Sequence, residues 1–111
     1  MIGGNTTVNI QIKTGASGNG IGEKVSKWEN IQTIIGFLDL LDEDTKRSTY
    51  KTKIQESTHI FISDYVKLDK RIKTENSRLV DEDGLTYDIL LIDDPMKMHK
   101  QLEIYLKYTG G

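Results

Sequence analysis

The chain has 111 residues, which is enough for one domain with a single hydrophobic core. Its 15 basic and 17 acidic residues give a net charge of −2, the wrong balance for a protein whose main task is to grip a phosphate backbone. Cysteine is absent, which excludes disulfides, thiolate zinc sites and a cysteine nucleophile.

We expect a soluble protein that is made and used inside a cell, with no membrane partner. Residues 1–5 lack the basic region and apolar core of a signal peptide. No apolar run approaches the length of a membrane-spanning helix.

The chain begins with a strand pattern followed by glycines. Residues 7–13 alternate between apolar and polar side chains, and Val8, Ile10 and Ile12 share one face, which predicts a strand. Residues 14–22 are rich in glycine and predict a flexible hairpin tip.

Residues 25–41 are ambiguous between helix and strand, because their apolar positions partly fit a helical stripe. Thr33, Ile34 and Ile35 are β-branched, and Gly36 would weaken a helix by about 1 kcal/mol. We therefore predict a strand with a bend or bulge at Gly36.

Residues 42–55 form the most polar part of the chain. Their only large apolar side chains are Tyr50 and Ile54, too few to hold the segment against a core. The sequence predicts either a long exposed loop or a short helix capped by Asp42 or Asp44.

The second half of the chain predicts four more strands, at residues 58–65, 78–80, 85–93 and 102–108, where β-branched and aromatic residues dominate. The turn at residues 81–84 contains an Asp-Gly pair, a strong hairpin signal.

Pro95 closes the strand before it, since proline cannot donate a hydrogen bond to a ladder.

The six predicted strands give an all-β fold class: one domain over residues 1–111, a small and mostly antiparallel six-stranded β-barrel with long flexible loops. An open sandwich is the alternative.

No motif points to catalysis, a cofactor or a metal. The glycine cluster has neither the phosphate-loop nor the dinucleotide-binding spacing. His59 and His99 are isolated, and the carboxylates at 81–83 and 93–94 are expected to serve turns. We expect no enzyme, no catalytic residues, no cofactor and no metal site.

Residues 45–53 are basic in a chain that is acidic overall. They contain Lys46, Arg47, Lys51 and Lys53 and no acidic residue. Two interpretations remain open: a solvated loop, or a segment that meets nucleic acid or an acidic partner. The single aromatic residue, Tyr50, argues against a platform for stacked bases.

Several stretches from Trp28 onward share their order and spacing with a known family. They are Trp28, GFLDL at 36–40, KIQESTHIFI at 53–62, YDI at 87–89 leading to DDP at 93–95, and LEIYLK at 102–107. In this order the chain resembles the phage head-tail joining family, the head-closure or stopper proteins of long-tailed phages and prophages.

The resemblance implies a small β-barrel that forms a ring, commonly hexameric, between the portal-adaptor connector and the tail. Such a ring closes the DNA exit channel of the virion, docks the tail protein and touches packaged DNA transiently; it assembles in the cytoplasm of the host bacterium. The implied channel-lining loop falls within residues 42–55, and the candidate residues are Thr45, Lys46, Arg47, Ser48, Thr49, Tyr50, Lys51, Thr52 and Lys53. A second candidate loop, for docking, contains Gly15, Gly18, Asn19, Gly20 and Gly22.

Two other functions fit a small β-barrel. A nucleic-acid-binding module of the oligonucleotide-binding type would need an exposed aromatic face, for which the candidates are Tyr65, Tyr87, Tyr105 and Tyr108. A small hydrolase or lyase would need Asp88, Asp93 and Asp94 inside the barrel rather than exposed on turns.

Overall fold

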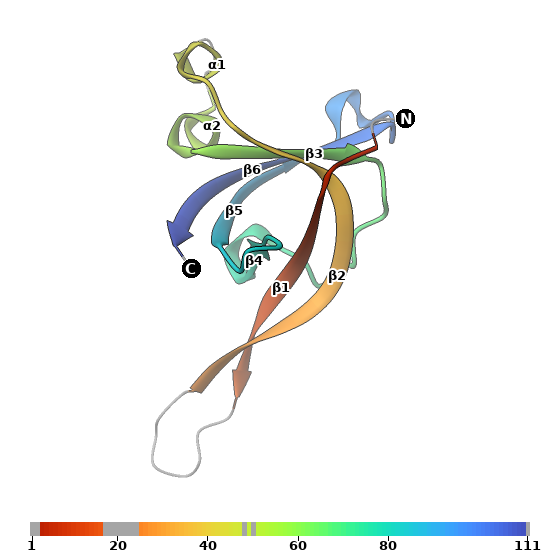
Figure 1. Ribbon diagram of the computed structural model, residues 1–111, viewed down its shortest axis with the longest axis vertical. Coiled ribbons are helices and arrows are strands. Elements are labelled where there is room, and N and C mark those ends of the chain that lie inside the picture. The colour runs from red at the N-terminus through yellow and green to blue at the C-terminus, as the bar shows by residue number, and fades with distance from the viewer. Residues whose placement is uncertain (1–2, 17–24, 48, 50, 111) are drawn as a thin grey trace.

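A computed structural model describes residues 3–16, 25–47, 49 and 51–110 of the chain (Figure 1). Its strands form one antiparallel sheet in the order β1-β2-β3-β6-β5-β4, which closes into a barrel between β4 and β1. The predicted all-β, six-stranded barrel is confirmed, and closure excludes the open sandwich. The strands are β1 Thr6–Ala16, β2 Val25–Leu40, β3 His59–Asp64, β4 Ser77–Val80, β5 Thr86–Asp93 and β6 Gln101–Gly110. The helices are α1 Glu43–Arg47 and α2 Thr52–Glu56, with the 3-10 turns η1 Thr74–Asn76 and η2 Pro95–Lys97.

The core lies inside the barrel and follows the alternation of the strands. Val8 and Ile10 of β1 are fully buried, as are Phe61 of β3 and Leu79 of β4. Ile104 pairs with Phe61 across β6 and β3, so the two side chains share the inner face. Successive strand residues point to opposite faces, and the same alternation therefore fixes which side chains line the outer wall.

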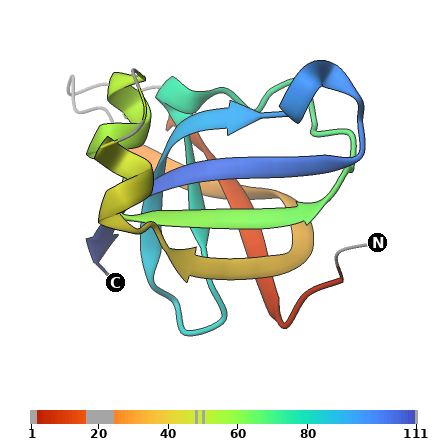
Figure 2. The ribbon, with the colours of Figure 1, turned by 90° about the horizontal axis from the view of Figure 1, so that it is seen from above.

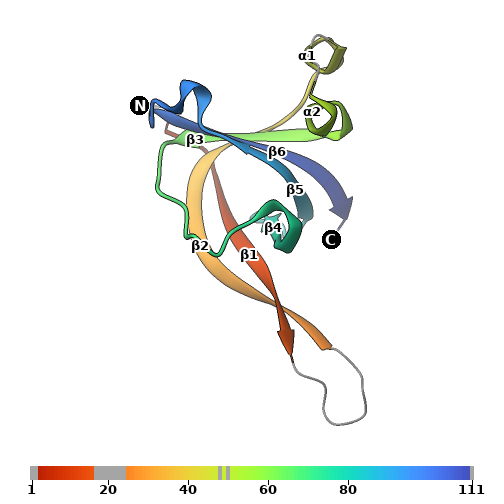
Figure 3. The same cartoon turned by 180° about the vertical axis from the view of Figure 1, so that it is seen from behind.

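β1 is longer than the sequence indicated. The prediction ended the strand at Lys13 and placed residues 14–22 in a loop, but β1 continues to Ala16, which pairs with Val25. Gly15 pairs with Ser26, because ladder hydrogen bonds use only the backbone and a glycine can take part in them. Figure 3 shows β1 and β2 running on past β4 as a two-stranded projection, which contributes to the longest extent of the molecule, 49 Å against 28 Å in the other two directions.

β2 is a single curved strand, as predicted, and it belongs to two ladders. It pairs with β1 as far as Gly36 and with β3 from Phe37 onward. The shift in register lies at Ile31, which has no partner in β1, and not at Gly36 where the bulge was expected. Gly36 instead stands where β2 passes from one neighbour to the next.

The polar region after β2 folds into two short helices, so the helical alternative is confirmed over part of it. The side chain of Asp42 accepts a hydrogen bond from the backbone N–H of Thr45 at 2.6 Å, as a helix cap does. α2 packs on β5 and β6 and buries Ile54. Both helices lie at the opposite end of the molecule from the β1–β2 projection (Figure 1).

The predicted hairpin at residues 81–84 joins β4 to β5. Gly84 has a φ of +79°, a conformation that favours glycine, and its N–H donates to the carbonyl of Asp81 at 3.1 Å. The carboxylate of Asp81 accepts hydrogen bonds from the N–H groups of Asp83 and Leu85. The turn role predicted for these carboxylates is borne out at Asp81.

Candidate interaction surfaces

The described candidate channel-lining residues lie in the segment that leaves the barrel between β2 and β3, which we call the excursion. Thr45, Lys46 and Arg47 lie in α1, and Thr52 and Lys53 lie in α2. Ser48 and Tyr50 are outside the described residues.

Hydrogen bonds fix both ends of this excursion to the barrel. The N–H of Leu41 donates to the carbonyl of Thr58 at 3.0 Å, and the N–H of Thr58 donates to the carbonyl of Leu106 at 2.7 Å. Lys46 forms a salt bridge of 3.6 Å with Glu43, whereas Arg47, Lys51 and Lys53 are exposed. The excursion therefore presents basic side chains on a short helical support.

The candidate docking loop is only partly described. Gly15 lies in the ladder of β1 and not in a loop. Gly18, Asn19, Gly20 and Gly22 lie outside the described residues.

A cationic and aromatic surface covers the base of the β1–β2 projection. The guanidinium of Arg78 on β4 lies 4.2 Å from the centre of the Trp28 ring, the distance of a cation–π contact. Its Nε donates to Gln11 Oε1 at 2.8 Å, and Gln11 Nε2 donates to Asn30 Oδ1 at 2.7 Å. Lys13 pairs with Trp28 on the same outer face. We call Lys13, Trp28 and Arg78 the hairpin face.

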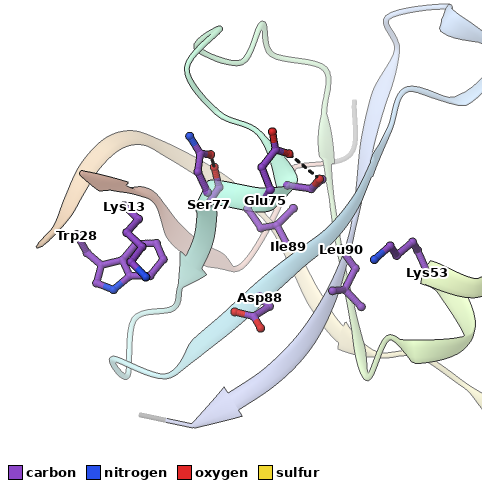
Figure 4. Close-up of a pocket in the computed structure, with 10 residues that line it drawn as sticks. Lys13, Trp28, Lys53, Glu75, Ser77, Asp88, Ile89 and Leu90 are labelled. Atoms are coloured by element: carbon purple, nitrogen blue, oxygen red, sulfur yellow. Dashed lines mark hydrogen bonds between the residues drawn. The ribbon is translucent and has the colours of Figure 1, made fainter. Parts of the chain in front are cut away.

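The hairpin face borders a cleft of about 390 Å³ (Figure 4). In that view Trp28 and Lys13 lie side by side, Asp88 projects from β5, and Lys53 reaches in from α2. From the sequence alone, Trp28 contributes to the family resemblance and is not placed in a surface. The sequence could not have revealed that Trp28 pairs with Lys13, because the register between β1 and β2 depends on the bulge at Ile31.

The opposite side of the barrel carries apolar residues on its outer surface. Ile35 and Phe37 of β2 are 58 % and 41 % exposed. Phe37 pairs with Ile62 of β3, and Ile60 of the same strand pairs with Tyr105 of β6, so these side chains share one face. Figure 2 shows β5, β6, β3 and β2 side by side as this wall. We call Ile35, Phe37, Ile60 and Ile62 the apolar wall.

Carboxylates surround the apolar wall. Asp39 pairs with Ile60, Glu103 with Ile62, and Asp93 with Glu103. Among the described residues, none of these three carboxylates forms a salt bridge. Burial raises the pKa of the adjacent Tyr105 to about 12, and the charge of Glu103 and the hydrogen bond to it act in the same direction.

The histidines take part in ring contacts and a turn. His59 packs edge-on against Tyr87, with ring centres 5.1 Å apart, and burial lowers its pKa against the opposing charges of Asp39 and Asp81. His99 is hydrogen-bonded through Nδ1 to Asp94. Within the described part of the chain, no three His, Cys, Asp or Glu side chains come together as a metal site would require.

The four tyrosines proposed as a base-stacking face do not form one. Tyr87 and Tyr105 are 4 % and 8 % exposed, so their rings are not available to stack on bases. Tyr108 is exposed beside Tyr87, whereas Tyr65 packs on His99 elsewhere.

The aspartates proposed for a hydrolase or lyase do not line the core. Asp88 is exposed on the outside of β5, and Asp93 and Asp94 are half-buried at the end of that strand. No described helix is long and apolar enough to cross a membrane.

Comparison with known proteins identifies the fold. No family model matches the chain, and no curated protein matches it. Among solved structures, the chain is similar to the solution structure of protein SF1141 from Shigella flexneri 2a, with a TM-score of 0.73 and 18 % sequence identity over 97 % of this chain and 95 % of that one. At this identity the likeness shows a shared fold alone.

Proposed function

We propose that this chain is a non-enzymatic head-closure protein of a long-tailed phage or prophage. In this role it forms a ring, commonly hexameric, between the portal-adaptor connector and the tail, closes the DNA channel and docks the tail. The observation that carries the proposal is the closed six-stranded barrel, in which the stretches that resemble the head-tail joining family follow one another on β2, on α2 and β3, on β5 and η2, and on β6.

Two further features support this function. The polar excursion between β2 and β3 and the β1–β2 projection extend from opposite ends of a rigid barrel, an arrangement in which loops can carry binding while the scaffold positions them. The net charge of −2 suits a channel through which DNA must later slide, because each phosphate that a protein neutralises strengthens its hold on DNA.

Deletion of the gene from the phage or prophage tests the proposal. We expect heads that package DNA but lose it and do not join tails, as seen by electron microscopy and by nuclease protection of the packaged DNA. DNA-filled heads that attach tails normally in the deletion strain would refute the proposal. Supplying the wild-type gene on a plasmid is the control.

Removal of residues 45–50 tests the channel segment within the same function. This change keeps Ile54 and α2, which pack on the barrel, so we expect the fold to survive. Particles assembled with the shortened chain should leak packaged DNA. Replacement of the same six positions by glycine and serine separates the effect of length from that of sequence, and unchanged DNA retention in the shortened variant would contradict the assignment.

A further inference from the structure

The two surfaces of the barrel differ in chemistry and lie on different sides of it. In the closed order of the sheet, β1 lies opposite β6 and β4 lies opposite β3. The hairpin face is built on β1, β2 and β4, while the apolar wall is built on β2 and β3, flanked by β6 and β5. Each subunit therefore has two dissimilar surfaces that share β2 but are centred on different parts of the sheet.

The apolar wall is the kind of surface that a partner covers. Ile35 and Phe37 are exposed side by side with Ile60 and Ile62 in the adjacent strand, and exposed apolar residues that form a continuous patch mark interaction sites on soluble proteins. The charged outward positions of these strands and of the flanking β5 and β6 include the carboxylates Asp39, Asp64, Asp93 and Glu103. The described basic residue on the outer face of β6 is Lys107, which pairs with Asp88 of β5 away from Phe37 and Ile62.

The hairpin face carries positive charge and an aromatic ring, and so complements the apolar wall and its carboxylates. Trp28 is 37 % exposed and stacked with Arg78, and tryptophan and arginine are the residue types most enriched at the energetic centres of protein interfaces. Lys13 adds a second cation beside them, and within the described residues neither Lys13 nor Arg78 has a carboxylate within salt-bridge distance. A cationic aromatic surface thus matches an apolar surface surrounded by carboxylates.

We infer that the apolar wall of one copy of this chain binds the hairpin face of the next copy in a head-to-tail contact. Such a contact is heterologous, and a succession of them closes into a ring when the rotation between neighbours permits it. Charge complementarity selects this occupant, because two hairpin faces, or two carboxylate-rimmed walls, would repel each other. The inference rests on the proposed ring and names the surfaces from which it would be built.

The absence of cysteine makes the contact directly measurable. Asn30→Cys marks the hairpin face and Gln101→Cys marks the side of the wall, and neither change removes a charge or an apolar side chain from the contact. We expect a short bismaleimide to cross-link the mixture of the two purified variants at high concentration more efficiently than either variant alone. Efficient cross-linking of a single variant to itself would indicate an isologous contact and overturn the inference, as would the absence of a mixed product.

A second pair of variants tests the head-to-tail geometry. Trp28→Ala disables the hairpin face and Phe37→Lys disables the apolar wall, and each should weaken association at least about 30-fold in sedimentation velocity. A one-to-one mixture should then form dimers and nothing larger, because only one complete pair of surfaces remains. Val66→Ala, which alters an exposed apolar residue outside both surfaces, is the control. A mixture that stays monomeric would overturn the inference.

These outcomes are independent of the head-closure assay. The cross-link is measured with purified protein, and head closure is measured by DNA retention in particles. A mixed cross-link would therefore stand even if gene deletion left heads closed, and its absence would not alter the result of the deletion.

Discussion

Gly36 occupies a position in β2 where a side chain does not fit. A Cβ atom built there would lie 2.7 Å from Cζ of Phe61 and would also clash with the backbone carbonyl oxygen of Ile62. A Cβ atom at Gly4 would in turn lie 2.5 Å from Cα of Gly36, and the N–H of Asn5 donates to the carbonyl of Gly36 at 3.1 Å. The close approach of three chain segments, rather than a bulge, explains this glycine.

Gly36→Ala should therefore lower the free energy of unfolding by about 2 kcal/mol, in the range for overpacked cores. Urea denaturation followed by circular dichroism measures the loss. Ile35→Ala is the matched control: it alters the adjacent, outward residue, and we expect a loss below about 1 kcal/mol. Equal losses for the two variants would contradict this account of Gly36.

Two buried tyrosines make stability sensitive to alkaline pH. Burial raises the pKa of Tyr87 to about 12, and its hydroxyl donates to Asp81 Oδ2 at 3.0 Å. The pKa of Tyr105 is likewise raised to about 12, from an ordinary value of 10.0. Between the ordinary tyrosine pKa of 10.0 and the raised pKa of about 12, the unfolded chain loses the phenolic protons while the folded chain keeps them. In this range the folded state therefore binds more protons than the unfolded state does.

The free energy of unfolding contributed by these groups is thus fully present below pH 10 and falls as the pH rises toward 12. We expect the double variant Tyr87→Phe/Tyr105→Phe to lose less stability across this range than the wild-type protein does. Urea midpoints at several pH values measure both slopes, and comparing the slopes removes the shared contribution of lysines. Parallel slopes would mean that the two phenols titrate normally in the fold.

Among the structural elements, α2 depends on the barrel. A helix of five residues is too short to be stable alone, and the residue before α2, Lys51, makes no side-chain capping hydrogen bond. Its one buried side chain is that of Ile54, 7 % exposed, and the helix packs on β5 and β6. The same contact holds the basic excursion in place at one end of the molecule.

Ile54→Ala should release α2 while leaving the barrel folded. We expect a loss of about 2 kcal/mol in the free energy of unfolding, at the low end for a buried isoleucine because the site is at the surface of the barrel. Hydrogen exchange should accelerate at the amides of Gln55 and Ser57, which donate within this turn, and much less at Phe61. Lys53→Ala, an exposed change in the same helix, should leave exchange unaltered, and uniform acceleration over the whole barrel would argue against separate release.

The strands differ in how far sequence could locate them. The alternation of Val8, Ile10 and Ile12 predicted β1 because only its inner face is apolar. In β2, by contrast, Ile34 is buried and Ile35 exposed, and a run of apolar residues does not tell which face is the core. The extension of β1 to Ala16 was missed because backbone pairing with β2 holds it, and glycine content gives no sign of that pairing.

The candidate surfaces were less predictable than the fold, for a related reason. Residues 45–53 were found by charge, which is visible in the sequence. The hairpin face joins Trp28 to Arg78, which are brought together only when β4 pairs with β1. The apolar wall likewise depends on the pairing of Phe37 with Ile62, so neither surface exists until the long-range register is set.

The molecule as a whole is held closed by its shortest strand. β4 has four residues, yet it pairs with β1 on one side and β5 on the other, and without it the sheet would have two open edges. Leu79 in its middle is fully buried and pairs with both Ile10 and Tyr87. The closed sheet predicts that the barrel unfolds in one cooperative step.

Leu79→Ala should lower the free energy of unfolding by about 3 kcal/mol, because it leaves a cavity where β4 meets the core. The chain has one tryptophan, Trp28, whose ring lies against Arg78 of β4, so its fluorescence reports this seam while far-ultraviolet circular dichroism reports all the strands. We expect the two urea transitions to coincide in the wild-type protein and to shift together in the variant. Val80→Ala, which changes a half-buried outward residue of the same strand, should cost about 1 kcal/mol or less. A fluorescence transition that precedes the circular dichroism transition would show that the β1–β4 seam opens before the rest of the barrel, and the molecule would then not unfold as a single closed unit.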